Sequence, residues 1–125
     1  MVAQKVRCFD PYSTVPDFNS LNEVVKYMAE HEGNSCLNYA NVADVCCRKI
    51  GMNTIRVDLW EEEEGKSIGH AILIAYDKPN EWHMFSNRNY GIIYSSDWCK
   101  AVTEYFNMAY AKVVIVKEHN QGSID

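Results

Sequence analysis

The sequence predicts an α+β protein in which two helices precede a mostly antiparallel β-sheet. Apolar residues recur at helical spacing over residues 20–33 and again over residues 35–50. From residue 53 onward the chain changes to short alternating or continuous apolar segments, which are typical of strands. The tetrapeptide Asp77–Asn80 forms turns readily and separates two of these segments. Because the second helix is apolar over a wide arc, we expect it to be a central helix packed on the sheet.

The composition indicates one globular domain over residues 1–125. Apolar residues make up 47% of the chain and charged residues 23%, and no break in composition divides the chain. Residues 1–19 are predicted to form an irregular leader, since Pro11 and Pro16 interrupt it. Residues 119–125 are polar and are expected to form a mobile tail.

Charge and hydropathy exclude several classes of function. The net charge is −5 and no basic stripe is present, which argues against nucleic-acid binding. No apolar run reaches the roughly 20 residues that span a bilayer, and the N-terminal segment lacks the apolar stretch of a signal peptide. We therefore expect no membrane association and a cytoplasmic protein with reduced thiols. The five cysteines form no C-x-x-C pair, so we expect neither a metal site nor a cofactor.

The first helix has a recognisable start and end. Ser20 and Glu23 have the spacing of a capping box, and Gly33 is a natural stop. His31 falls in the last turn, where we expect a solvated side chain. The second helix can be capped by Asn34 or Ser35.

The cysteines of the second helix occupy two different positions. Cys36 stands at its start, whereas Cys46 and Cys47 lie two to three turns further along in its apolar part. Free N–H groups and the helix dipole stabilise negative charge at a helix N-terminus, and the thiolate is the nucleophilic form of cysteine. We therefore predict a reactive Cys36 and two inert, buried thiols.

The second half of the chain is predicted to contain five strands and one helix. Strands are expected over residues 53–60, 69–76, 81–87, 90–94 and 109–118. A helix is expected over residues 95–106, capped by Ser95 or Ser96. The acidic run Glu61–Glu64 is interpreted as a solvated loop.

His70 is the histidine best placed to act with Cys36. It begins the strand over residues 69–76 and shares its face with Ile72 and Ile74. If that face packs on the Cys36 helix, the imidazole could meet the thiol. A third group should come from the next strand, and the hairpin register decides which residue it is. One register pairs His70 with Asn87, and a register shifted by one residue pairs it with Ser86.

These residues resemble the active site of the transglutaminase-like cysteine hydrolases, a papain-like superfamily. The segment Gly33-Asn-Ser-Cys36 with Ala40 is similar to the family's G-x-C-x-x-x-A helix start. The turn from Arg48 through Gly51 to Arg56 is similar to the family's turn into the next strand, and His70-Ala71 to its catalytic "HA" strand. The pattern Trp82-x-x-x-Ser86 matches the family's W-x-x-x-D, with serine in place of the carboxylate. The resemblance covers about residues 33–91.

The resemblance implies a cysteine hydrolase or acyltransferase that acts on amide bonds of a protein or peptide. Cys36 would be the nucleophile, His70 the base, and Ser86 or Asn87 the orienting group. Because serine carries no charge, the alternative is a catalytically degenerate module that uses the same fold to bind a partner protein. So short a chain could also recognise its target as a homodimer.

Overall fold

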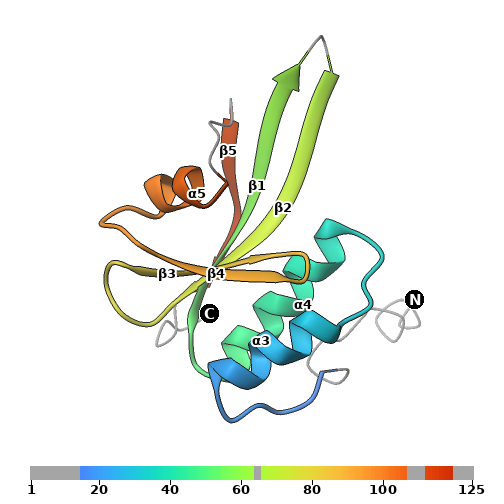
Figure 1. Ribbon diagram of the computed structural model, residues 1–125, viewed down its shortest axis with the longest axis vertical. Coiled ribbons are helices and arrows are strands. Elements are labelled where there is room, and N and C mark those ends of the chain that lie inside the picture. The colour runs from blue at the N-terminus through green and yellow to red at the C-terminus, as the bar shows by residue number, and fades with distance from the viewer. Residues whose placement is uncertain (1–14, 64–65, 107–111, 120–125) are drawn as a thin grey trace, which may run out of the picture.

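The computed structural model describes residues 15–63, 66–106 and 112–119, and within them it is an α+β fold (Figure 1). The elements follow one another as α3 (Leu21–Glu30), α4 (Cys36–Lys49), β1 (Asn53–Glu63), β2 (Lys66–Tyr76), β3 (Glu81–Ser86), β4 (Asn89–Tyr94), α5 (Trp98–Phe106) and β5 (Lys112–His119). The strands form one antiparallel sheet with the order β4-β3-β2-β1-β5. The predicted α+β class with an antiparallel sheet is confirmed. None of the helices described has the length and apolar character needed to cross a membrane.

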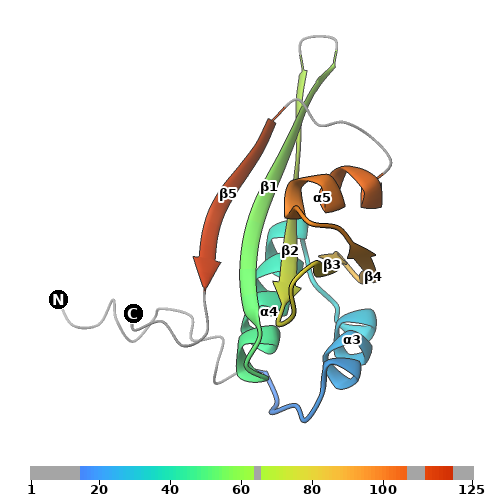
Figure 2. The same ribbon diagram turned by 90° about the vertical axis from the view of Figure 1, so that its left-hand side faces the viewer.

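The two faces of the sheet pack on different helices. One face contributes Leu73, Ala75 and Phe85 to a core shared with α3 and α4. The opposite face contributes Ile72, Ile74 and Met84 to a second core, which α5 completes. Figure 2 shows α4 and α5 at different heights along β2. Strand residues alternate between faces, and this alternation decides which helix each side chain meets.

Serine residues cap both N-terminal helices, as predicted. The Ser20 hydroxyl accepts a hydrogen bond from the Glu23 amide at 3.3 Å, and the Glu23 carboxylate accepts one from the Asn19 amide at 3.0 Å. In α4 the Ser35 hydroxyl accepts from the Asn38 amide at 3.1 Å, so Ser35 is the cap. The two serine hydroxyls each satisfy an amide that the first helical turn leaves unpaired.

His31, expected in a solvated last turn, is instead held between neighbours. It caps the C-terminus of α3, which ends at Glu30 before Gly33 is reached. Its ring stacks on Tyr27 at 5.9 Å, and its Nε2 lies 2.9 Å from the Asn38 side-chain oxygen. The loop between α3 and α4 is therefore fixed by side chains of both helices.

Three other predicted boundaries are wrong. The acidic residues 61–63 belong to β1, because the β1–β2 hairpin is longer than the apolar pattern suggested. His119 lies in β5 opposite Thr54, whereas it was expected in the tail. The N-cap of α5 is Asp97, whose carboxylate accepts a hydrogen bond from the Cys99 amide at 3.0 Å. Val15, placed in the leader, is buried in the core, while residues 1–14 and 120–125 lie outside the described part.

The β2–β3 register differs from both predicted pairings. Leu73 pairs with Phe85 and Ala75 with His83, so continuing the ladder puts Ile72 opposite Ser86. This register still places His70 and Ser86 on the same face, as the shifted pairing predicted. The two residues are diagonal neighbours, a separation that side chains can bridge.

Candidate active site

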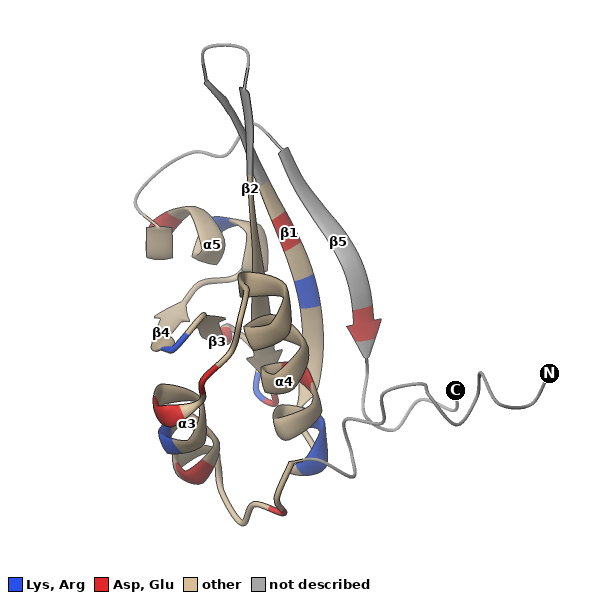
Figure 3. Ribbon diagram, turned by 90° about the vertical axis from the view of Figure 1, so that its right-hand side faces the viewer, with Lys and Arg blue, Asp and Glu red and all other residues tan. Residues whose placement is uncertain are grey.

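Cys36 is the first residue of α4, at the start of the helix as predicted, and it is half-buried. The first two turns of the helix carry no charged residue, and the basic residues lie in its last turn (Figure 3). Just before the helix, the backbone at Gly33 lies close to the side chains of Asn38 and Tyr39. A Cβ there would lie 2.8 Å from the Tyr39 ring, closer than side chains pack, so a larger residue would force the Tyr39 side chain to move.

The other two cysteines of α4 are completely buried in the core, in agreement with the prediction that they are inert. Burial raises the pKa of the Cys46 thiol to about 12, and burial together with the neighbouring Cys46 and Asp44 groups raises the pKa of Cys47 well above its usual value. Both remain protonated at neutral pH and lack the thiolate that a nucleophile requires.

His70 is held by the sheet face that packs on α5. Its Nε2 lies 2.7 Å from the Ser86 hydroxyl, and its ring meets the edge of Phe106 at 6.0 Å. Burial lowers the pKa of His70 below 6.5, so the imidazole is neutral at pH 7 and has a nitrogen that can accept a proton. A neutral imidazole and a hydroxyl are therefore in direct contact.

Cys36 and His70 line one open cavity of about 410 Å³, together with Leu37, Arg56, Asp58, Gly69 and Ala71. The His70 ring bonds to Ser86, and among the described residues no hydrogen bond joins it to the Cys36 sulfur. The sequence analysis assumed that the strand face carrying His70 packs on the Cys36 helix. The structure shows instead that this face packs on α5. Cys36 and His70 therefore border one cavity, while the His70 ring contacts Ser86 and Phe106 on the α5 side of the sheet.

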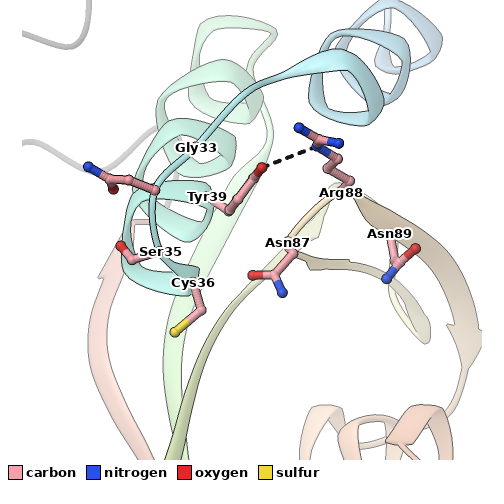
Figure 4. Close-up of a pocket in the computed structure, with 8 residues that line it drawn as sticks. Gly33, Ser35, Cys36, Tyr39, Asn87, Arg88 and Asn89 are labelled. Carbon is pink, nitrogen blue, oxygen red and sulfur yellow. Dashed lines mark hydrogen bonds between the residues drawn. The ribbon is translucent and has the colours of Figure 1, made fainter.

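Asn87 lies in a second cavity and away from His70. Its φ of 53° places it in the left-handed turn between β3 and β4. It lines a hollow of about 540 Å³ with Cys36, Tyr39, Gly33, Asn34, Ser35, Arg88 and Asn89 (Figure 4). Of the two candidates for the third group, Ser86 is the one bonded to His70.

Two arginines belong to these cavities and were not identified from the sequence. Arg88 donates from Nε to the His31 carbonyl at 2.8 Å and to the Tyr39 hydroxyl at 3.1 Å, which ties the β3–β4 turn to the α3–α4 loop. Arg56 donates to Asn41 at 2.8 Å and forms an ion pair with Asp58 at 3.3 Å. Arg88 is 57 residues from His31 in the sequence, so no local pattern signals the contact.

The residues do not indicate a metal centre, and the comparisons with known proteins identify no family. Within the described ranges, no three His, Cys, Asp or Glu side chains gather closely enough to hold a metal ion. No protein-family model, curated protein or solved structure matches the chain. The functional assignment therefore depends on the residues of the site and on the resemblance of their pattern.

Proposed function

We propose that the protein is a transglutaminase-like cysteine hydrolase or acyltransferase that acts on amide bonds of a protein or peptide. One observation carries the proposal: Cys36, at the first residue of a 14-residue helix, lines the same cavity as His70, whose imidazole is bonded to the Ser86 hydroxyl. Nucleophile, base and orienting group are the parts that thiol acyl transfer needs.

The reaction follows from these roles. His70 accepts the proton of the Cys36 thiol, and the sulfur attacks the carbonyl carbon of the amide. The backbone N–H of Cys36 can donate to the resulting oxyanion. The tetrahedral adduct then expels the amine, which takes the proton from His70. The acyl group remaining on sulfur passes to water in a hydrolase or to a second amine in an acyltransferase. Substrate binding has to bring the sulfur and the imidazole into contact, since catalytic hydrogen bonds often tighten only in the complex.

Ser86 can orient the imidazole but cannot neutralise it. When His70 takes up the proton it becomes an imidazolium ion, and a hydroxyl gives that charge less support than a carboxylate. We therefore expect a slow enzyme. Ser86→Asp should raise the acylation rate, whereas Ser86→Ala should lower it, because the first adds a counter-charge and the second removes the orienting bond.

The alternative is a catalytically degenerate module that binds a partner protein. The observations that favour it are the neutral Ser86 and the packing of His70 on α5, with no bond to the thiol among the described residues. In that case Cys36 would be a residue of the binding surface, and its replacement would leave reactivity unchanged.

Acylation by a p-nitrophenyl ester decides between the two proposals. The enzyme proposal predicts a burst of nitrophenol and an acyl adduct on Cys36, located by mass spectrometry. Cys36→Ala should abolish the burst, and His70→Ala should slow it about 100-fold or more. Cys99→Ala is the matched control, since Cys99 is also a thiol on a helix. If the two cysteine variants react alike, the protein is a binding module.

The pH dependence of acylation provides an independent check. His70 must be neutral to accept the thiol proton, and burial lowers the pKa of His70. The rate should therefore rise with pH through an apparent pKa below 6.5 and reach a plateau before neutrality. Ser86→Asp should move this acid limb upward, because a carboxylate stabilises the imidazolium. A profile that Ser86→Asp leaves unmoved would show that His70 is not the base.

A further inference from the structure

Two cavities meet at Cys36 and differ in chemistry. The cavity that contains His70 has apolar walls at Leu37 and Ala71, and its charges are balanced by the Arg56–Asp58 ion pair. The second cavity is lined mainly by polar and amide groups. Among the described residues, Cys36 is the one common to both linings. A substrate whose carbonyl carbon lies over the sulfur would therefore have one neighbouring group in each cavity.

The second cavity carries one unbalanced positive charge. Asn34, Asn87 and Asn89 line it with neutral amides, and Arg88 is the charged member of its lining, with no carboxylate among the described residues that form it. In Figure 4 the Arg88 guanidinium lies at one end of the hollow and Cys36 at the other, with Tyr39 and Asn87 between them. The charge of the lining therefore favours a negatively charged group.

Arg88 is held in place before any ligand arrives. Its Nε donates to the His31 carbonyl and to the Tyr39 hydroxyl, so the planar guanidinium is fixed by groups from two other segments. Both of these bonds use Nε, and the two terminal nitrogens can together donate to the two oxygens of a carboxylate. A fixed fork loses less entropy on binding than a flexible lysine would.

We propose that the second cavity is the recognition site for a carboxylate on the substrate, the side chain of an Asp or Glu residue close to the amide that reacts, and that Arg88 is its specificity-determining residue. This inference rests on the proposed function for its orientation relative to Cys36. It adds a substrate class, acidic peptides, to a reaction that would otherwise accept any amide.

Peptide binding tests the inference separately from catalysis. The probes are three blocked pentapeptides of alanine with Glu, Gln or Lys in the middle, titrated into the Cys36→Ala protein while the side-chain amide signals of Asn87 and Asn89 are followed by NMR. We expect the Glu peptide to bind about fivefold more tightly than the Gln peptide at low salt, and the Lys peptide to bind most weakly. The preference should shrink as salt is added, because the arginine is exposed.

Variants of Arg88 identify the source of the preference. Arg88→Gln should bind the Glu and Gln peptides equally, and Arg88→Glu should prefer the Lys peptide. Lys100→Gln, which removes one exposed positive charge from α5, is the matched control and should keep the preference for Glu. Far-UV circular dichroism of each variant shows whether the fold is retained, and Arg88→Lys, which retains the charge, should recover part of the preference.

The possible outcomes separate the two proposals. If the three peptides bind alike, or if Lys100→Gln reduces the preference as much as Arg88→Gln, the carboxylate site is wrong even where Cys36 is reactive. If the charge preference depends on Arg88 but no acyl adduct forms on Cys36, the enzyme proposal fails and the recognition site remains.

Discussion

The two ends of α4 place the same residue type in opposite environments. Cys36, at the N-terminus, borders two open cavities, whereas Cys46 and Cys47 near the C-terminus are completely buried. The three side chains are chemically identical, and only their position along the helix differs. At the N-terminus the thiol can be reached by solvent and ligands, whereas near the C-terminus the thiols serve as small apolar side chains. Experiments that compare the two ends therefore test the assignment of the site directly.

Alkylation should give the largest difference between the two ends. Iodoacetamide should modify Cys36 in the folded protein at least about 100-fold faster than Cys46 or Cys47, because the buried thiols react only when the structure opens. Peptide mapping by mass spectrometry at successive times measures each site separately. In urea the three rates should converge. Equal rates in the folded protein would mean that α4 does not pack as described.

Replacing a thiol by a hydroxyl should change the free energy of unfolding by different amounts at the two ends of α4. Cys47→Ser should lower the free energy of unfolding by about 2 kcal/mol, since it buries a polar group in an apolar core. Cys36→Ser should change it by less than about 0.5 kcal/mol, as expected of a half-buried residue outside the apolar cores. Urea denaturation monitored by tryptophan fluorescence measures both values. A larger loss for Cys36→Ser would show that this residue is a core residue.

Alkaline pH should lower stability through the buried end of α4. The pKa of Cys46 is about 12 in the folded protein, compared with 9.0 for an unperturbed thiol. Its contribution to stability is complete below pH 9 and is lost as the pH rises toward 12, because the unfolded chain releases the proton first. Stability measured at pH 8 and pH 10 should therefore fall less in Cys46→Ala than in the unmodified protein.

The sequence predicted the two ends of α4 well because their signals are local. Ser35 caps the helix through an amide three residues away, and the apolar spacing by itself identifies the buried half. Whether the His70 side chain faces the Cys36 helix depends on long-range packing instead. Which face of β2 packs on α4 is decided by how three helices share two sides of a sheet, and no pattern around His70 contains that information.

The β2–β3 hairpin shows the same limit on a smaller scale. The sequence left two registers open, and the one that placed His70 and Ser86 on the same face agrees with the structure in that respect. The residue opposite each one depends on the conformation of the turn, where Asn80 adopts a φ of 64° that the sequence does not dictate. Arg88 and Arg56 were missed for a related reason, because their partners come from elements distant in the chain.

The smallest predicted effect concerns the cap of α4, and it links stability to the reactivity of Cys36. Ser35→Ala removes the hydroxyl that accepts from the Asn38 amide, which should cost about 1 kcal/mol of unfolding free energy. Ser20→Ala removes the equivalent bond to Glu23 from α3 and should cost a similar amount. The two variants loosen different turns. The first turn of α4 contains the Cys36 thiol, whereas the first turn of α3 contains no residue of the site.

Alkylation of Cys36 should therefore change in Ser35→Ala and not in Ser20→Ala when both are measured far below their unfolding transitions. If the two variants alkylate at the same rate, the helix N-terminus does not control the thiol, and the reactivity of Cys36 would have to come from the cavity walls instead.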